Sequence, residues 1–333
     1  MLDILKRYKA SNTPEKITHH FAKSIKIKHP YTETILAYEA GVAFFEEHLF
    51  TFDKIYQYLS YIIIEGKHNH NDIMMKIKHH GHTIESIYMI KTPRETIRIR
   101  CDLSYDGTQF KGFQRQNHKN TVQNELESVL KHLYQQIITI HPASRTDTSV
   151  HALHQVVHFD CPNTLTPLKL KTLLNDMLPN TIHVISAKQV PAVFHARYDT
   201  ISKTYQYHFH HYRDPFKANY SVYREGFNLN ELNNTLQPFI GTHDFASFAK
   251  SEDKKTLRTI YNAVAVSQDK HTIIEITGNG FLRHMVRMII GKVLHDLNHQ
   301  NKTIKRALDN PSADTPKLLA PPEGLYLAKI HYQ

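Results

Sequence analysis

The sequence predicts an α+β protein in which two duplicated half-domains, each an antiparallel sheet flanked by helices, form a central cleft. Three observations lead to this prediction. The chain has 333 residues, 41% hydrophobic and 22% charged, as expected for a folded protein with room for more than one domain. Thr92-Pro93 interrupts the chain, and the spacing of apolar residues changes after it. Strand, helix and strand patterns then recur in each half. The expected segments are residues 1–95, 96–200 and 201–333.

The first segment, residues 1–95, is predicted to be a mainly helical N-terminal domain. Thr13-Pro14-Glu15 combines a hydroxyl cap, a proline at the first helical position and an acid in the first turn. Residues 33–50 are strongly apolar and predict a second helix, and Asp53 is placed to cap a third. The apolar side of this third helix would consist of Ile55, Leu59, Ile62 and Ile63. No group of reactive residues stands out, so the role of this segment is open.

The second segment begins with a half-buried strand at 96–105, where apolar and polar side chains alternate. Asp106-Gly107 turns the chain, and Thr121 is placed to cap an amphipathic helix. The elements expected next are a polar loop, a buried strand, a helix and a strand, at 141–150, 155–159, 167–177 and 181–190.

The third segment repeats this order. Residues 203–212 and 271–278 alternate as strands do, with a helix and a loop between them. A late helix is predicted at 279–297 and a closing strand at 324–332. Neither GxGxxG nor a P-loop is present, which argues against a nucleotide-cofactor domain.

The charge of the chain favours an anionic partner. Lys and Arg outnumber Asp and Glu by 41 to 31, a formal net charge of +10. Residues 1–95 contribute 13 − 11 = +2, so the rest of the chain contributes 28 − 20 = +8. Nucleic acid is favoured over a membrane surface as the partner, although basic proteins that bind no polyanion are also common.

Cysteine and histidine usage limits the other classes. Two cysteines, Cys101 and Cys161, exclude a disulfide scaffold and favour a reducing compartment. No long apolar stretch is present, so we expect a soluble, cytoplasmic protein. The histidines near residues 68–82 lack HExxH or zinc-finger spacing, and a solvated histidine-rich face is favoured over a metal site.

The loop 144–149 holds the first candidate reactive residues. Asp147 is surrounded by hydroxyl residues, and its commonest role in such a stretch is to cap a turn. Arg145 lies two positions away and would face the same side on an extended backbone. His151 is expected to hydrogen-bond to backbone rather than to act as a base.

Other candidates lie in the third segment. Arg283 and Arg287 are four residues apart and would share the flank of the late helix, where they could pair with a carboxylate or phosphate. Tyr205, beside Lys203, and Phe245 are aromatics that usually belong to a core but also suit stacking on an unpaired base.

Seven motifs in order make these residues more specific. The motifs are Y-D-G-T-x-F-x-G-F-Q (105–114), T-V-Q-x-x-L-E (121–127), S-R-T-D-x-x-V-H-A (144–152), K-T-Y-x-Y (203–207), G-T-H-D-F-x-S-F (241–248), G-N-G-F-L-x-x-M-V-R (278–287) and E-G-L-Y-L (323–327). From about residue 97 to the end, the chain resembles the TruA family of tRNA pseudouridine synthases. The resemblance does not cover residues 1–95.

The resemblance implies a role for several residues. It places the nucleophile at Asp147, the arginine that replaces the flipped base at Arg145, and the active-site tyrosine at Tyr205. Arg287 would pair with the carboxylate of Asp147. We expect further substrate contacts from Lys203, Arg283 and Phe245.

The implied reaction is the isomerisation of uridine to pseudouridine at positions 38, 39 and 40 of the tRNA anticodon stem-loop. It needs no cofactor and no metal, and the family suggests a homodimer. Two alternatives stay open: the same reaction on a different RNA, and an RNA-binding protein that has lost catalysis. A DNA-binding protein is less favoured, because no recognition-helix motif is found.

The sequence departs from the family pattern inside the loop. The family usually has glycine where this chain has Ser144 and Ser149. Glycine is required where φ is positive or where backbone passes close by. Serine at both positions would shift the loop slightly and lower the rate or change which uridine fits.

Overall fold

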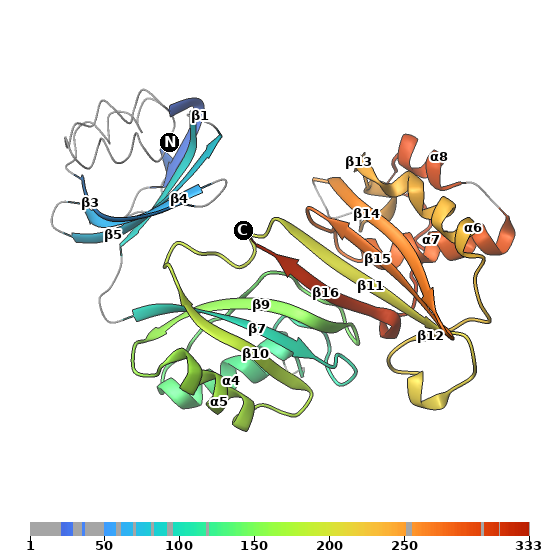
Figure 1. Cartoon of the computed structure of the whole chain (residues 1–333), viewed down its shortest axis with the longest axis horizontal. Coiled ribbons are helices and arrows are strands. Elements are labelled where there is room, and N and C mark those ends of the chain that lie inside the picture. Colours follow the sequence, from blue (N-terminus) through green and yellow to red (C-terminus); the bar gives the residue numbers. More distant parts are fainter. Residues whose placement is uncertain are drawn as a thin grey trace.

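The structure is a computed structural model and contains two β-sheets (Figure 1). It describes residues 21–28, 35–36, 50–57, 61–68, 71–80, 83–91, 96–117, 120–250, 255–300, 303–312 and 314–332. The first sheet, of six strands, lies N-terminal to residue 92, and the second, of ten strands, begins at residue 96.

The six-stranded sheet is formed by β1 (Phe21–Lys28), β2 (Ile35–Leu36), β3 (Phe50–Gln57), β4 (Tyr61–His68), β5 (Asn71–His80) and β6 (Thr83–Lys91). Its order is β2-β1-β6-β5-β4-β3, in which β3 to β6 form an antiparallel meander. β1 pairs with β6 in parallel.

The prediction of a mainly helical N-terminal domain is wrong for the described residues of this segment. Asp53 lies in β3 instead of capping a helix, and Ile62 and Ile63 lie in β4. Three consecutive isoleucines, Ile62 to Ile64, are all buried, which is the pattern of a strand covered on both faces. β-Branched residues favour such a strand over a helix. The helix predicted at Thr13 lies outside the described residues, as does most of 33–50.

The ten-stranded sheet carries most of the remaining chain. Its first half consists of β7 (Thr96–Tyr105), α4 (Val122–Tyr134), β8 (His141–Pro142), β9 (His151–Pro162), α5 (Pro167–Met177) and β10 (Ile182–Val190). Its second half consists of β11 (Ser202–His210), β12 (Val222–Tyr223), α6 (Leu229–Leu236), β13 (Gly241–Asp244), β14 (Leu257–Gln268), β15 (His271–Gly278), α7 (Met285–His299), α8 (Ile304–Asp309) and β16 (Leu325–His331). Short 3₁₀ turns lie at Pro215–Lys217, Gln237–Phe239, Ala246–Phe248 and Pro322–Gly324.

The order of this sheet repeats one pattern twice. Its strands follow β10-β7-β9-β16-β11-β15-β14-β13, so the first strand of each half lies between two later strands of that half. Most pairs are antiparallel, as predicted. The two halves nevertheless form one continuous sheet, because β9 and β16 pair in parallel through Tyr326↔His151 and Leu327↔Ala152. The sheet is therefore mixed. In Figure 1, α4 and α5 lie beside the first half, and α6, α7 and α8 beside the second.

Several predicted elements are confirmed, and two need correction. The strand at 96–105 and the helix at 167–177 have the predicted bounds, and the Thr121 hydroxyl accepts a hydrogen bond from Asn124 N. The late helix begins at Met285 instead of 279. β14 was not predicted, because its outward residues are mixed in character and it lies near the sheet edge.

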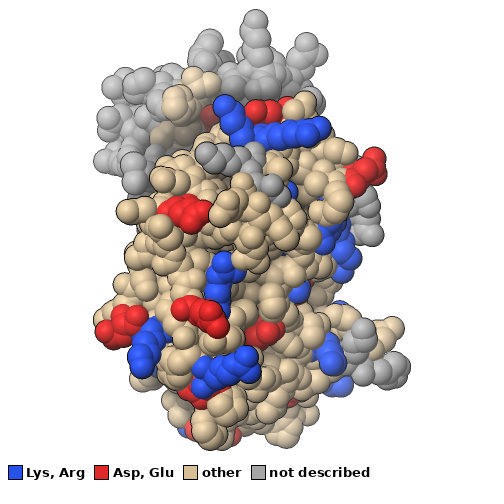
Figure 2. Space-filling view, turned by 90° about the vertical axis from the view of Figure 1, so that its right-hand side faces the viewer, with Lys and Arg blue, Asp and Glu red and all other residues tan. Residues whose placement is uncertain are grey.

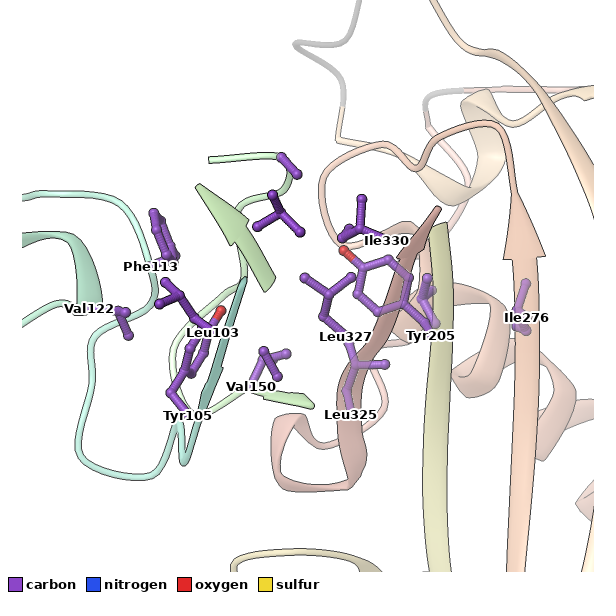
Figure 3. Packing of buried hydrophobic residues seen from close by; sticks show 14 of the residues in the cluster. Leu103, Tyr105, Phe113, Val122, Val150, Tyr205, Ile276, Leu325, Leu327 and Ile330 are labelled. Atoms are coloured by element: carbon purple, nitrogen blue, oxygen red, sulfur yellow. The ribbon is translucent and has the colours of Figure 1, made fainter. Parts of the chain in front are cut away.

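Apolar side chains fill the junction between the two halves (Figure 3). Val150 from the first half and Tyr205, Leu325 and Leu327 from the second belong to one buried cluster. Each fully buried side chain of this kind contributes about 1.5–3 kcal/mol. The junction therefore fixes the first half against the second, at the place where the cleft opens.

Candidate active site

The two halves enclose an open cleft of about 930 Å³. Eight of its lining residues are Lys or Arg, and one lining residue, Asp147, is acidic. The basic residues are Lys111, Arg115, Arg145, Arg197, Lys203, Arg258, Arg283 and Arg287. The outer face shown in Figure 2 differs, because there Lys and Arg are interspersed with Asp and Glu. The cleft thus concentrates positive charge around one carboxylate, an arrangement suited to a polyanion.

The loop that carries Asp147, residues 144–150 (the Asp147 loop), rests on residues 110–113. Phe113 N donates to Thr146 O at 3.1 Å, and Ser149 N donates to Phe110 O at 3.3 Å. Gly112 has φ +91°, and a Cβ there would lie 2.8 Å from Thr146 O. Only glycine permits this conformation at this close approach. The first motif therefore forms the support for the Asp147 loop.

The carboxylate of Asp147 faces the second half of the sheet. Its Oδ1 lies 3.3 Å from His284 Nε2 and its Oδ2 lies 3.9 Å from Arg287 Nη1. The Asp147 side chain is 29% exposed, whereas those of His284 and Arg287 are 14% exposed. Arg287 is fixed in turn because its Nε donates to Ala320 O at 2.7 Å. Asp147 thus contacts groups on the opposite wall of the cleft, which a turn cap would not do.

Tyr205 lies beside the Asp147 loop, on β11. Its side chain is buried, and its hydroxyl hydrogen-bonds with Ser144 Oγ at 3.0 Å. Its ring packs edge-on against Phe281 with centroids 5.1 Å apart. The pKa of the Tyr205 hydroxyl is raised to about 12. Burial is the main cause, the charge of Asp147 acts in the same direction, and the hydrogen bond with Ser144 acts against both. The phenol therefore stays protonated near neutral pH and can donate a hydrogen bond.

His284 is a site residue that the sequence analysis missed. It precedes α7 with φ 64°, a left-handed conformation that turns its imidazole toward Asp147. Its Nδ1 is buried and has no hydrogen-bond partner among the described residues. In the sequence, His284 occupied an unassigned position of the G-N-G-F-L-x-x-M-V-R motif. A histidine directly before the helix that carries Arg287 was the available signal.

The remaining predicted cations line the cleft. Lys203 Nζ donates to Ala143 O at 2.6 Å. Burial, together with the charges of Arg197 and Arg258, lowers the pKa of Lys203 to about 8. Arg145 is exposed, and no described residue makes a hydrogen bond or ion pair with its guanidinium. Arg283 lies in the turn before α7, so the predicted helical pairing of Arg283 with Arg287 is wrong, although both line the cleft.

Two other expectations have clear outcomes. The prediction of Phe245 as a substrate contact is corrected: its side chain is fully buried, packs against Phe248 and does not line the cleft. His151 hydrogen-bonds to backbone, as expected. Its Nδ1 accepts from Gly107 N at 3.1 Å and its Nε2 lies 2.9 Å from Asn219 O. Burial lowers the pKa of His151, which suits a structural, neutral imidazole.

The two serines of the Asp147 loop behave differently. Ser149 has φ 60°, in the left-handed region that favours glycine. This conformation costs a non-glycine residue about 1–2 kcal/mol. Ser144 is not among the positive-φ residues, and its hydroxyl contacts Tyr205 instead. Serine therefore introduces strain at 149, whereas at 144 it adds a hydrogen bond.

The described ranges contain neither a metal-binding cluster nor a membrane-spanning helix. Within these ranges no group of three or more His, Cys, Asp or Glu residues is placed to hold a metal ion. His68, His79 and His80 lie in strands, and His70 and His82 lie outside the described residues. Cys101 and Cys161 are buried thiols. None of the described helices is long and apolar enough to cross a membrane.

Comparison with known proteins gives a consistent result. A family model described as tRNA pseudouridine synthase matches residues 103–199 and 236–333. A protein from Anoxybacillus flavithermus named tRNA pseudouridine synthase A is 38% identical over 71% of this chain and 98% of its own length. A protein of the same name from Staphylococcus epidermidis is 35% identical over 71% of this chain and 91% of its own. The match to an NTF2-like structure from Cytophaga hutchinsonii covers 27% of this chain and 95% of the other chain, with 15% identity. Its TM-score of 0.23 is too low to indicate a common fold.

Proposed function

The chain belongs to the tRNA pseudouridine synthase family, and from this premise we propose that it isomerises uridine in the tRNA anticodon stem-loop, with Asp147 as nucleophile. The observation that carries the proposal is the position of Asp147. Among the described residues, its carboxylate is the single acidic group lining a cleft with eight Lys and Arg residues, and it faces Arg287 and His284 across that cleft.

The chemistry suits these groups. The reaction breaks the N1–C1′ bond of a uridine and forms a C5–C1′ bond on the same nucleotide, so no atom is gained and there is no net oxidation. The carboxylate can attack C1′, displace N1 and hold the ribose while the uracil turns. C5 then displaces the carboxylate from C1′, C5 loses its proton and N1 gains one, so that the atoms balance. The Arg287 guanidinium lies 3.9 Å from Oδ2 of Asp147, on the wall of the cleft that the carboxylate faces.

The uridine must first leave its stack, which costs a few kcal/mol. Arg145 supports this step because its exposed guanidinium is planar and can stack where the base had been. Tyr205 forms part of the wall beside Asp147, where its protonated hydroxyl can donate to the displaced uracil. Lys203, Arg283 and the other cleft cations would hold the RNA backbone, so affinity should fall steeply with salt.

His284 orients the Asp147 carboxylate in this scheme. Its Nε2 lies 3.3 Å from Oδ1, whereas its Nδ1 is buried and has no hydrogen-bond partner among the described residues. Nε2 is therefore the ring nitrogen that faces the carboxylate. We assign His284 a positioning role in which it faces one oxygen while Arg287 faces the other.

The substrate and assembly belong to the same proposal. The relatives are named for tRNA, and we propose uridines 38, 39 and 40 as the targets and a homodimer in the cytoplasm as the working form. A different RNA is the alternative substrate. An RNA-binding protein without catalysis is less favoured, because the strained Ser149 leaves Asp147 in contact range of His284 and Arg287.

The test maps pseudouridine in unmodified tRNA transcripts after incubation with the protein. We expect wild type to form pseudouridine at positions 38–40, Asp147→Ala to form none, and Asp176→Asn, an exposed change on α5, to match wild type. Absence of pseudouridine from wild type with RNA binding intact would refute the enzymatic proposal. Product outside the anticodon stem would refute only the assigned positions.

A further inference from the structure

The six-stranded sheet packs against the segment 191–199, which joins β10 to β11. Ile63 of β4 and Met74 of β5 form a small buried cluster with Val193, and Ala192 packs against it. Ile63 alternates with Ile62 and Ile64 along β4, so it lies on the opposite face of the sheet. Residues 192 and 193, from the part of the chain that forms the cleft, therefore cover this face of the sheet around Ile63 and Met74.

A buried ion pair lies beside this apolar contact. Lys76 follows Met74 by two residues on β5, so it points from the same face, and its ammonium pairs with Asp199. The two side chains are 15% and 8% exposed. Burial lowers the pKa of Lys76, and Asp199 opposes that change. Lys78, two residues further along, is 62% exposed and pairs with Glu85 instead. The two lysines provide a matched comparison between a buried and an exposed pair.

Asp199 also closes a turn, residues 195–199 (the rim turn). Its second carboxylate oxygen accepts from His195 N at 2.9 Å, and Asp199 N donates to His195 O at 3.0 Å. The imidazole of His195 accepts in turn from Arg197 N at 3.1 Å and Tyr198 N at 3.3 Å. The position of Asp199 therefore affects the residues at the tip of the turn.

The tip of the rim turn borders the cleft. His195, Arg197 and Tyr198 all line it, and the Tyr198 ring is 74% exposed. The Arg197 guanidinium carbon lies 5.9 Å from the centre of that ring. An exposed aromatic ring next to arginine, at the edge of a basic cleft, is a surface on which an unpaired base can stack.

We propose that the N-terminal sheet braces the rim turn through Lys76 and Asp199, so that Tyr198 and Arg197 form a stacking surface for the RNA. The proposal assigns a role to the part of the chain that the family match does not reach, and it rests on the proposed function only in taking RNA as the ligand. Lys76 is a positioning residue that acts through Asp199, and Tyr198 is the group that contacts RNA.

The test measures the Kd of the full-length protein for an unmodified tRNA transcript, and separately the single-turnover rate at saturating tRNA. Tyr198→Ala should raise Kd about tenfold, as expected for the loss of one stacked base. Lys76→Met should raise Kd severalfold, whereas Lys78→Met stays within about twofold of wild type. The single-turnover rate should be unchanged in both lysine variants. In the double variant Lys76→Met/Tyr198→Ala, Kd should match that of Tyr198→Ala alone, because both changes affect the same contact.

Three results would overturn the brace. The first is an unchanged Kd in Lys76→Met. The second is a lower single-turnover rate in Lys76→Met at saturating tRNA. The third is a double variant in which the effects of Lys76→Met and Tyr198→Ala on Kd add in full, which would mean that the sheet contacts the RNA itself. If Lys76→Met does not fold, Asp199→Asn replaces it. The amide oxygen of asparagine can still accept from His195 N, but the ion pair with Lys76 is lost. Lys76→Arg keeps the positive charge and should therefore keep the Kd of wild type. The measurement of Kd does not depend on catalysis. If wild type binds RNA but makes no pseudouridine, the proposed function is refuted, whereas the Kd values of the variants still test the brace.

Discussion

The Asp147 loop and the rim turn border the same cleft but are held in different ways. Backbone hydrogen bonds from Phe113 and to Phe110, within the same half of the sheet, hold the Asp147 loop. The rim turn depends on Asp199, which pairs with Lys76 of the other sheet. Uncharged local contacts thus position the proposed chemistry, and a long-range ion pair positions the proposed RNA contact. Changes to the loop should therefore alter the rate, and changes near the rim should alter affinity.

Among the residues that support or border these two regions, the largest effect is expected at Gly112, beneath the Asp147 loop. Gly112→Ala forces an L-residue to φ +91° and places its Cβ 2.8 Å from Thr146 O. We expect a loss of about 2–3 kcal/mol in the free energy of unfolding and about a hundredfold fall in kcat. Gly226 is the control, because its φ is +147° but no atom lies within 4 Å. Gly226→Ala should lose stability without losing kcat. Equal kcat losses in both variants would show that Gly112 does not support the loop.

Removing the His284 side chain tests the opposite wall of the cleft. His284→Gly keeps the positive φ accessible and removes the group beside Asp147 Oδ1, so kcat should fall on the order of a hundredfold with little change in Kd. His284→Asn tolerates the same backbone and retains a donor, so part of the rate should return. His299→Ala, at the exposed end of α7, is the control. A rise in Kd without a fall in kcat would assign His284 to RNA binding.

Lys203 connects the two regions, since it donates to Ala143 O beside the loop and senses the charge of Arg197 in the rim turn. Its pKa is lowered to about 8, so the side chain loses its charge as pH rises through 8. Phosphate favours the charged form, and Kd should therefore rise by up to about tenfold per pH unit above 8. The unfolded chain binds more protons between pH 8 and about 10.5, so this group makes stability increase with pH in that window.

The comparison for Lys203 is Lys203→Arg, which stays charged throughout. Its Kd should lack the additional dependence on pH above 8 that wild type shows. Identical pH profiles for the two proteins, measured at one salt concentration, would mean that Lys203 does not contact the RNA electrostatically.

The smallest effect is expected at Ser149. Ser149→Gly removes the conformational cost of a serine at φ 60°. Glycine also increases the entropy of the unfolded chain, which offsets part of this gain. The net effect should be a stabilisation of about 0.5–1 kcal/mol. Thermal unfolding measures this change. Ser144→Ala is the contrasting variant, because it removes the hydrogen bond to Tyr205 without relieving strain and should not stabilise. Destabilisation by Ser149→Gly would indicate that the hydroxyl makes a contact worth more than the strain.

Much of the ten-stranded sheet could be predicted from the sequence, because its elements have strong caps and alternation. Thr121 accepts a hydrogen bond at the start of α4, as its position in the sequence predicts. The roles of Asp147, Tyr205 and Arg287 were predicted from the resemblance that the ordered motifs carry, since the neighbouring residues alone favoured a turn cap for Asp147. The structure brings these three residues to one cleft.

The remaining features depend on information that is not local. The run Ile62 to Ile64 is compatible with the apolar side of a helix and with a strand that is buried on both faces. The two are distinguished only by the tertiary structure, in which Val193 covers part of the second face of the strand. The late helix begins at Met285 because His284 adopts a left-handed conformation, which no propensity indicates. The pairing of Lys76 with Asp199 joins residues 123 positions apart, and neither stands out in the sequence.

Asp147→Asn tests the central claim most directly, because the amide keeps the size of the side chain and removes its charge. The measurement is the single-turnover rate of pseudouridine formation on an unmodified tRNA, together with Kd for the same RNA. We expect the rate to fall by at least about 10³-fold while Kd changes by less than about threefold. Pseudouridine formation by Asp147→Asn at a rate near that of wild type would contradict the assignment of Asp147 as the nucleophile.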